Sequence, residues 1–133
     1  MIRLPLNRIL LVDDDTDIQT IVKMSLEIVG GFTVEVCSSG DEALQKLPLF
    51  KPDLILLDVM LPGMDGPAIF EAIKKIPDCQ NIPVIFLTAK VQTQNIDTYQ
   101  KLGVIAVLKK PFDPMTLSNK IKEIWNGHYE YDE

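Results

Sequence analysis

Polar side chains end each of four strongly hydrophobic runs in this chain, and their types suit phosphoryl and metal chemistry. The pairs of run and polar end are Ile9–Val12 with Asp13, Asp14 and Asp15, Leu54–Leu57 with Asp58, Val84–Leu87 with Thr88, and Val104–Leu108 with Lys109 and Lys110. Such runs are typical of strands buried on both faces of a parallel sheet. Because ligands bind beyond the carboxyl ends of such strands, we expect carboxylates, a hydroxyl and an ammonium to converge at one edge.

The three consecutive aspartates after the first run exceed what helix capping requires. One Asp would cap the next helix, whereas three in succession repel one another and require a cation. We therefore expect functional roles for Asp13 and Asp14, with Asp15 as the cap or facing solvent.

Asp58 also ends a hydrophobic strand, and the alternative is a turn-initiating residue. The cap of the following helix is expected further on, at Asp65 or Gly66. Carboxylates clustered at Asp13, Asp14 and Asp58 would raise one another's pKa unless a divalent metal ion neutralised them. A site with oxygen ligands and no His or Cys favours Mg²⁺, or Mn²⁺, over zinc.

Thr88 and Lys110, at the other two strand ends, differ in how strongly they indicate a functional site. Thr88 alone is weak evidence, because Thr is common both as a helix cap and in strands. Lys110 precedes Pro111, and a Lys-Pro pair can have a cis bond that redirects the chain. Strand alternation places Lys109 on the opposite side, facing solvent.

Helix-period segments alternate with the strands, which predicts one α/β doubly wound domain of five strands and five helices. The first helix is expected to stop at Gly30-Gly31. Its buried face would be Ile18, Ile21, Val22, Ile28 and Val29. An edge strand is expected at 32–36, and Ser39 with Glu42 predicts a capping box for a helix that ends at Pro48.

The last two helices are expected to differ in how firmly they are held. The segment from Val91 to Leu102 has a thin apolar stripe, so it should be the most loosely held helix. The final helix would open at Asp113-Pro114 and end near Asn126-Gly127. This gives a domain at 1–127 and a frayed acidic tail at 128–133, with no room for an effector domain.

Composition excludes several classes of function. A chain of 133 residues with 47% hydrophobic residues can build one core. A net charge of -6 argues against nucleic-acid binding, which needs a basic face. No run is long enough to span a membrane, and the start lacks a signal peptide. Cys37 and Cys79 lack metal or redox spacing, so reduced thiols in a cytoplasmic protein are expected.

In combination, these motifs resemble the receiver domain of bacterial two-component response regulators of the single-domain, chemotaxis-regulator-like kind, over essentially the whole chain. The matching motifs are Leu11-Val12-Asp13-Asp14, Asp58 with the loop from Met60 to Gly66, Thr88-Ala89, and Lys110-Pro111-Phe112. Their order matches the family, as do the intervals of 44 residues from Asp14 to Asp58, 30 to Thr88 and 22 to Lys110.

The resemblance implies a fold and a set of roles. The fold would be flavodoxin-like, with strand order 2-1-3-4-5 and helices on both faces. Asp58 would be the phosphoacceptor, and Thr88 and Lys110 would contact the phosphoryl oxygens. The Mg²⁺ ligands would be Asp13, Asp14, Asp58 and the backbone carbonyl of Met60. The family usually has Tyr or Phe three residues before the Lys; here that residue is Val107, so we expect signalling through the helix at 91–102 instead of a ring rotation.

An aspartate nucleophile also agrees with the residue types, because a carboxylate is ionised at neutral pH and needs no general base. The only histidine, His128, falls in the expected tail. The phosphohistidine donor must then be another protein, a histidine kinase or a histidine phosphotransfer protein. The chain would catalyse only its own phosphorylation and dephosphorylation. It would signal through an unknown protein target or a phosphorelay, as a monomer or a weak phosphorylation-dependent dimer.

Three other functions of similar folds remain as alternatives. A pseudo-receiver that docks constitutively would not need the acidic pair, Asp58 and Lys110. A phosphatase of the haloacid dehalogenase type uses Asp-x-Asp-x-Thr, but the fifth residue from Asp13 is Asp17. Flavin or nucleotide binding would call for a glycine-rich phosphate loop, which the sequence lacks.

Overall fold

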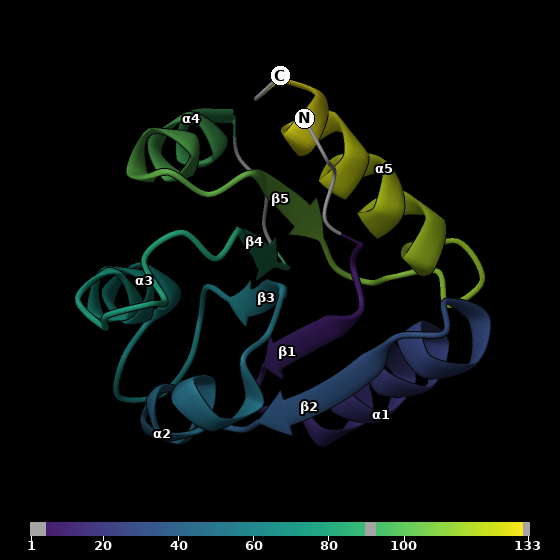
Figure 1. Ribbon diagram of the computed structural model, residues 1–133, viewed down its shortest axis with the longest axis horizontal. Coiled ribbons are helices and arrows are strands. Elements are labelled where there is room, and N and C mark those ends of the chain that lie inside the picture. Colours follow the sequence, from purple (N-terminus) through teal and green to yellow (C-terminus); the bar gives the residue numbers. More distant parts are fainter. Residues whose placement is uncertain (1–4, 90–92, 132–133) are drawn as a thin grey trace.

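A five-stranded parallel sheet forms the centre of the molecule (Figure 1). The computed structural model describes residues 5–89 and 93–131, and the side chains within that part except 93–95 and 130–131. The strands are β1 (Arg8–Val12), β2 (Thr33–Cys37), β3 (Leu54–Asp58), β4 (Val84–Thr88) and β5 (Ala106–Lys109). Their order is β2-β1-β3-β4-β5 with every pair parallel, so the expected fold class and strand order are confirmed.

Helices cover both faces of this sheet. They are α1 (Thr16–Met24), a π-helical turn η1 (Ser25–Val29), α2 (Gly40–Phe50), α3 (Gly66–Lys74), α4 (Thr93–Leu102) and α5 (Leu117–Tyr131). In Figure 1, α1 and α5 lie on one face, and α2, α3 and α4 lie on the other. Within the described residues, none of these helices has the length and apolar character needed to cross a membrane.

The central strands are buried on both faces, as their hydrophobic runs predict. Alternate residues of each strand enter two separate core clusters. The cluster towards α2 and α3 contains Leu10, Val12, Ile55, Leu57 and Phe86. The cluster towards α1 and α5 contains Ile9, Leu11, Leu54, Leu56 and Leu87. Because β1, β3 and β4 are held from both sides, their carboxyl ends are firmly placed.

The predicted buried face of the first helix is wrong at Ile21 and again after Met24. Ile21, Ile28 and Val29 are 45%, 75% and 44% exposed, whereas Val22 and Leu26 are buried. The chain changes to a π-helical turn after Met24, with Gly30 N donating to the Ser25 carbonyl at 3.3 Å. This wider turn rotates the following residues away from the α-helical projection.

Two predicted helix ends are also wrong. α2 continues past Pro48 to Phe50, because in the last turn a proline removes a single hydrogen bond and Lys51 N still donates to the Leu47 carbonyl at 3.0 Å. α5 continues to Tyr131, so residues 128–131 belong to this helix and not to a frayed tail. The Tyr129 ring packs on the Trp125 ring with centroids 4.6 Å apart, which stabilises the turn that includes Gly127.

Other local expectations are confirmed, except that α5 begins at Leu117 and not at Pro114. Ser39 caps α2 through a hydrogen bond from Glu42 N at 3.2 Å, and the Lys110-Pro111 bond is cis. α4 ends at Leu102 as expected, while Val91, the expected start of that segment, lies outside the described residues. The side chains of Ile96, Tyr99 and Leu102 are only half-buried, in agreement with a thin apolar stripe.

The loop after β3 returns so closely on itself that only glycine fits at position 66. A Cβ atom there would lie 2.8 Å from Val59 Cα and 2.9 Å from the Asp58 carbonyl oxygen. We predict that Gly66→Ala lowers the free energy of unfolding by about 1–3 kcal/mol, because backbone atoms must move apart. Gly127→Ala is the matched control: its Cβ would meet no atom within 4 Å, and alanine favours helix by up to ~1 kcal/mol. Urea denaturation of both variants tests this, and equal stabilities would contradict it.

Candidate functional site

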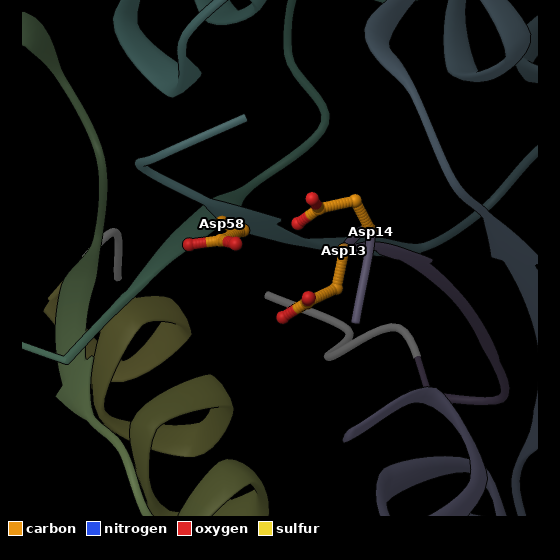
Figure 2. A group of neighbouring side chains, drawn as sticks. All are labelled: Asp13, Asp14 and Asp58. Atoms are coloured by element: carbon orange, nitrogen blue, oxygen red, sulfur yellow. The ribbon is translucent and has the colours of Figure 1, made fainter. Parts of the chain in front are cut away.

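The strand ends bring the polar residues into one pocket, as the sequence predicts. Asp13 follows β1, Asp58 ends β3, Thr88 ends β4, and Lys110 follows β5. A pocket of about 390 Å³ at this edge is lined by Asp13, Asp14, Asp15, Ile18, Asp58, Met60, Thr88, Ala89 and Lys110. Figure 2 shows the carboxylates of Asp13, Asp14 and Asp58 gathered in one region.

The Lys110 ammonium lies between two carboxylates. Lys110 Nζ is 2.6 Å from Asp13 Oδ2 and 3.2 Å from Asp58 Oδ2. The side chains are little exposed, at 11% for Lys110, 0% for Asp13 and 8% for Asp58. With so little water nearby, these charges interact more strongly than a surface ion pair would.

Backbone groups hold the same carboxylates in place. Asp13 Oδ1 accepts a hydrogen bond from Asp15 N at 2.9 Å, and Asp58 Oδ1 accepts one from Met60 N at 3.2 Å. Each carboxylate therefore has one oxygen bound to backbone N–H and the other to Lys110.

Neighbouring aspartates perform the capping that was expected of them. Asp15 caps α1 by accepting from Asp17 N at 2.9 Å, and Asp65 caps α3 by accepting from Ala68 N at 2.9 Å. Lys109 is exposed, as strand alternation predicts. Capping is thus supplied by other residues, and Asp13 and Asp58 are available for other chemistry.

The electrostatics favour an additional cation. Burial, followed by repulsion from Asp13, raises the pKa of Asp58, although Lys110 and the Met60 N–H act against this rise. Burial lowers the pKa of Lys110, but its hydrogen bond to Asp13 and the attraction of Asp13 and Asp58 outweigh burial, so this pKa is raised. Lys110 thus stays protonated, and it does not fully compensate the carboxylates.

The acidic cluster is suitable for a hard metal ion. One carboxylate oxygen from each of Asp13, Asp14 and Asp58 can be chosen so that all three lie within 4.8 Å of one another. Asp14 is exposed and Asp13 and Asp58 are buried, so the cluster opens to solvent on the Asp14 side. Oxygen donors alone, without His or Cys, fit Mg²⁺ or Mn²⁺.

Two parts of the site were not anticipated from the sequence. Gln19 Nε2 donates to the Asp13 carbonyl at 2.5 Å and to Ser38 Oγ at 2.9 Å, which ties α1 to the loops after β1 and β2. The direct contact between Lys110 and Asp13 joins residues 97 positions apart. For Gln19, the only indication in the sequence is that a polar residue stands one turn into the helix after Asp13.

The comparisons with known proteins agree with one another. The family described as "Response regulator receiver domain" matches residues 9–122. The alkaline phosphatase synthesis transcriptional regulatory protein PhoP of Bacillus subtilis is 38% identical over 88% of this chain and 48% of its own length. The transcriptional regulatory protein CpxR homolog of Haemophilus influenzae is 39% identical over 90% of this chain and 50% of its own. The chain thus spans about half the length of these curated relatives.

Two solved structures are similar to this chain over most of its length. Chemotaxis response regulator CheY4 of Vibrio cholerae has a TM-score of 0.82 and 28% identity, over 90% of this chain and 99% of that one. A CheY-like response regulator receiver domain protein of Methanospirillum hungatei has a TM-score of 0.81 and 32% identity, over 96% and 99% of the two chains.

The raised pKa of Asp58 predicts a pH-dependent stability difference in metal-free buffer. Between the unfolded pKa of this carboxyl and its higher folded pKa, the folded state binds more protons, so rising pH destabilises the wild type. Asp58→Asn lacks this titration. Its stability relative to the wild type should therefore increase as the pH rises above about 4, the usual pKa of an aspartate, measured by urea denaturation. A difference that does not change with pH would contradict the prediction.

Proposed function

Because the chain belongs to the receiver domain family of two-component response regulators, we propose that it accepts a phosphoryl group on Asp58 from a phosphohistidine of another protein. One observation carries this proposal. Asp58 ends a buried strand with its carboxylate in an acidic pocket, 3.2 Å from the Lys110 ammonium. The nucleophile and a charge that can balance the incoming group thus lie side by side.

The transfer exchanges one bond for another. A carboxylate oxygen of Asp58 forms a bond to phosphorus while the bond from phosphorus to the donor imidazole nitrogen breaks, and that nitrogen keeps the electron pair. Lys110 acts against the rise in the pKa of Asp58 and, with the Thr88 hydroxyl, contacts the phosphoryl oxygens, where negative charge is concentrated. Hydrolysis of the acyl phosphate by water then returns the free carboxylate.

We propose that Asp13, Asp14, Asp58 and the Met60 carbonyl hold Mg²⁺, or Mn²⁺, beside this position. The all-oxygen donor set and the three clustered carboxylates support that choice. The bound ion supplies positive charge that Lys110 alone does not provide.

The donor is a separate protein, a histidine kinase or a histidine phosphotransfer protein. The only histidine, His128, lies in α5 and lines a pocket with Ile82 and Pro83, next to the start of β4. That is the amino-terminal edge of the sheet, opposite Asp58.

The phosphorylated chain signals to a downstream protein or passes the group on in a phosphorelay. It acts as a monomer or a weak phosphorylation-dependent dimer, and the only reaction it catalyses is on itself.

Treatment with a small-molecule phosphodonor and Mg²⁺, followed by intact-mass measurement, tests the proposed function. The wild type should gain the mass of one phosphoryl group, and Asp58→Asn should gain none. Asp65→Asn is the matched control, since this exposed cap of α3 lies in the same loop and asparagine also caps helices. An unlabelled wild type, or a fully labelled Asp58→Asn, would refute the proposal.

Asp14→Ala tests the metal site separately. Loss of one of three carboxylates should weaken Mg²⁺ binding by about tenfold or more, measured by calorimetric titration. The variant should also melt at a higher temperature in metal-free buffer, because one repulsive charge is gone. Asp15→Ala removes the next aspartate, which caps α1, and should leave Mg²⁺ affinity unchanged. Equal affinities for the wild type and Asp14→Ala would exclude this ligand set.

A further inference from the structure

Helix α4 is attached to the rest of the molecule by few side chains. Among the side chains that the structure describes, each of the other α-helices has at least one that is buried, and α4 has none. Ile96, Tyr99 and Leu102 are half-buried and make up its inner face. The position of α4 therefore depends on a small number of individual contacts, which is typical of elements that move.

The first of these contacts is a ring pair between α4 and β4. The Tyr99 ring meets the Phe86 ring edge-on, with centroids 5.1 Å apart and an interplanar angle of 85°. Phe86 is fully buried and meets Phe70 of α3 in a second edge-on contact at 6.0 Å. Such contacts are directional, so the Tyr99 ring fixes where α4 lies over the sheet.

The second contact fixes the end of α4. Lys74 Nζ of α3 donates to the Leu102 carbonyl at 2.7 Å and lies 4.3 Å from the centroid of the Phe70 ring. The end of α4 is thus anchored to α3, while Tyr99, one turn earlier, is anchored to β4. The Tyr99 contact connects the helix directly with β4, the strand that leads to the candidate site.

Phe86 is closely connected to that site. It precedes Thr88 by two residues in β4, so both side chains lie on the same face of the strand, and Thr88 lines the acidic pocket. In β5 the residue opposite Phe86 is Val107, which is small and half-buried. Val107 has no ring to transmit a movement of β4, whereas Tyr99 has one in direct contact with Phe86.

We propose that Tyr99 is the positioning residue that couples phosphorylation of Asp58 to the position of α4, an inference that rests on the proposed function. A phosphoryl group on Asp58 binds the Thr88 hydroxyl and displaces the end of β4. The Phe86–Tyr99 contact transmits this displacement to α4, which exchanges between a docked and a shifted position. The phosphoryl group selects between the two positions through its contact with Thr88, and the ring pair makes α4 respond.

Hydrogen exchange of α4 residues 96–102, with and without beryllofluoride and Mg²⁺, tests this coupling. In Tyr99→Leu without beryllofluoride, exchange should be faster by about two- to tenfold, the range expected for loss of one aromatic pair. The change that beryllofluoride causes in the wild type should be mostly lost. Tyr99→Phe keeps the ring and should behave as the wild type. Phe50→Leu removes a ring at the end of α2, where it lies 4.1 Å from the Arg8 guanidinium, and should leave the beryllofluoride response of α4 intact.

Labelling of Asp58 by a small-molecule phosphodonor, measured by mass in the same samples, separates the two hypotheses. If Tyr99→Leu is labelled and its α4 still responds to beryllofluoride as in the wild type, the role of Tyr99 is overturned and the proposed function stands. Loss of the response in Tyr99→Phe would also overturn it, because the ring is retained. Absence of label in the wild type would overturn the proposed function and, with it, this inference.

Discussion

The candidate site depends on one lysine that neutralises two buried carboxylates. Asp13 and Asp58 lie at the ends of neighbouring strands, and their charges would destabilise the folded protein if nothing of opposite sign were near. Lys110 Nζ contacts both, at 2.6 and 3.2 Å, although Lys110 follows β5, two strands away from β3. A long side chain is needed to cover that separation. The remaining negative charge makes the pocket suitable for a divalent cation and for a reaction that adds a phosphoryl group.

The arrangement of the site depends more on the buried side chains of the strands than on contacts among the site residues. β1, β3 and β4 have hydrophobic side chains in both core clusters, so the ends of these strands are fixed relative to one another. The polar residues follow directly at those ends. In contrast, α4 has no buried side chain among those described, so few buried contacts hold it on the sheet. A rigid site beside a weakly attached helix is an arrangement suited to a switch.

The sequence predicted the sheet and the pocket well, because a buried run ending in a polar residue is a local signal. The hydrophobic runs identified β1, β3 and β4, and the residues after them identified Asp13, Asp58 and Thr88. Features that depend on distant contacts were missed. The π-helical turn is held to the turn before α5 by a hydrogen bond from the Ser25 hydroxyl to the Pro114 carbonyl at 2.5 Å. The extension of α5 beyond Gly127 depends on the Trp125–Tyr129 pair. No local pattern predicts either.

The most direct test of the account is to locate the phosphoryl group chemically. After treatment with a small-molecule phosphodonor and Mg²⁺, borohydride reduces an aspartyl phosphate to homoserine, which peptide sequencing by mass spectrometry can place in the chain. The account predicts homoserine at position 58 and at no other aspartate. Homoserine at Asp13 or Asp14, or none at all in protein that has gained a phosphoryl group, would contradict it.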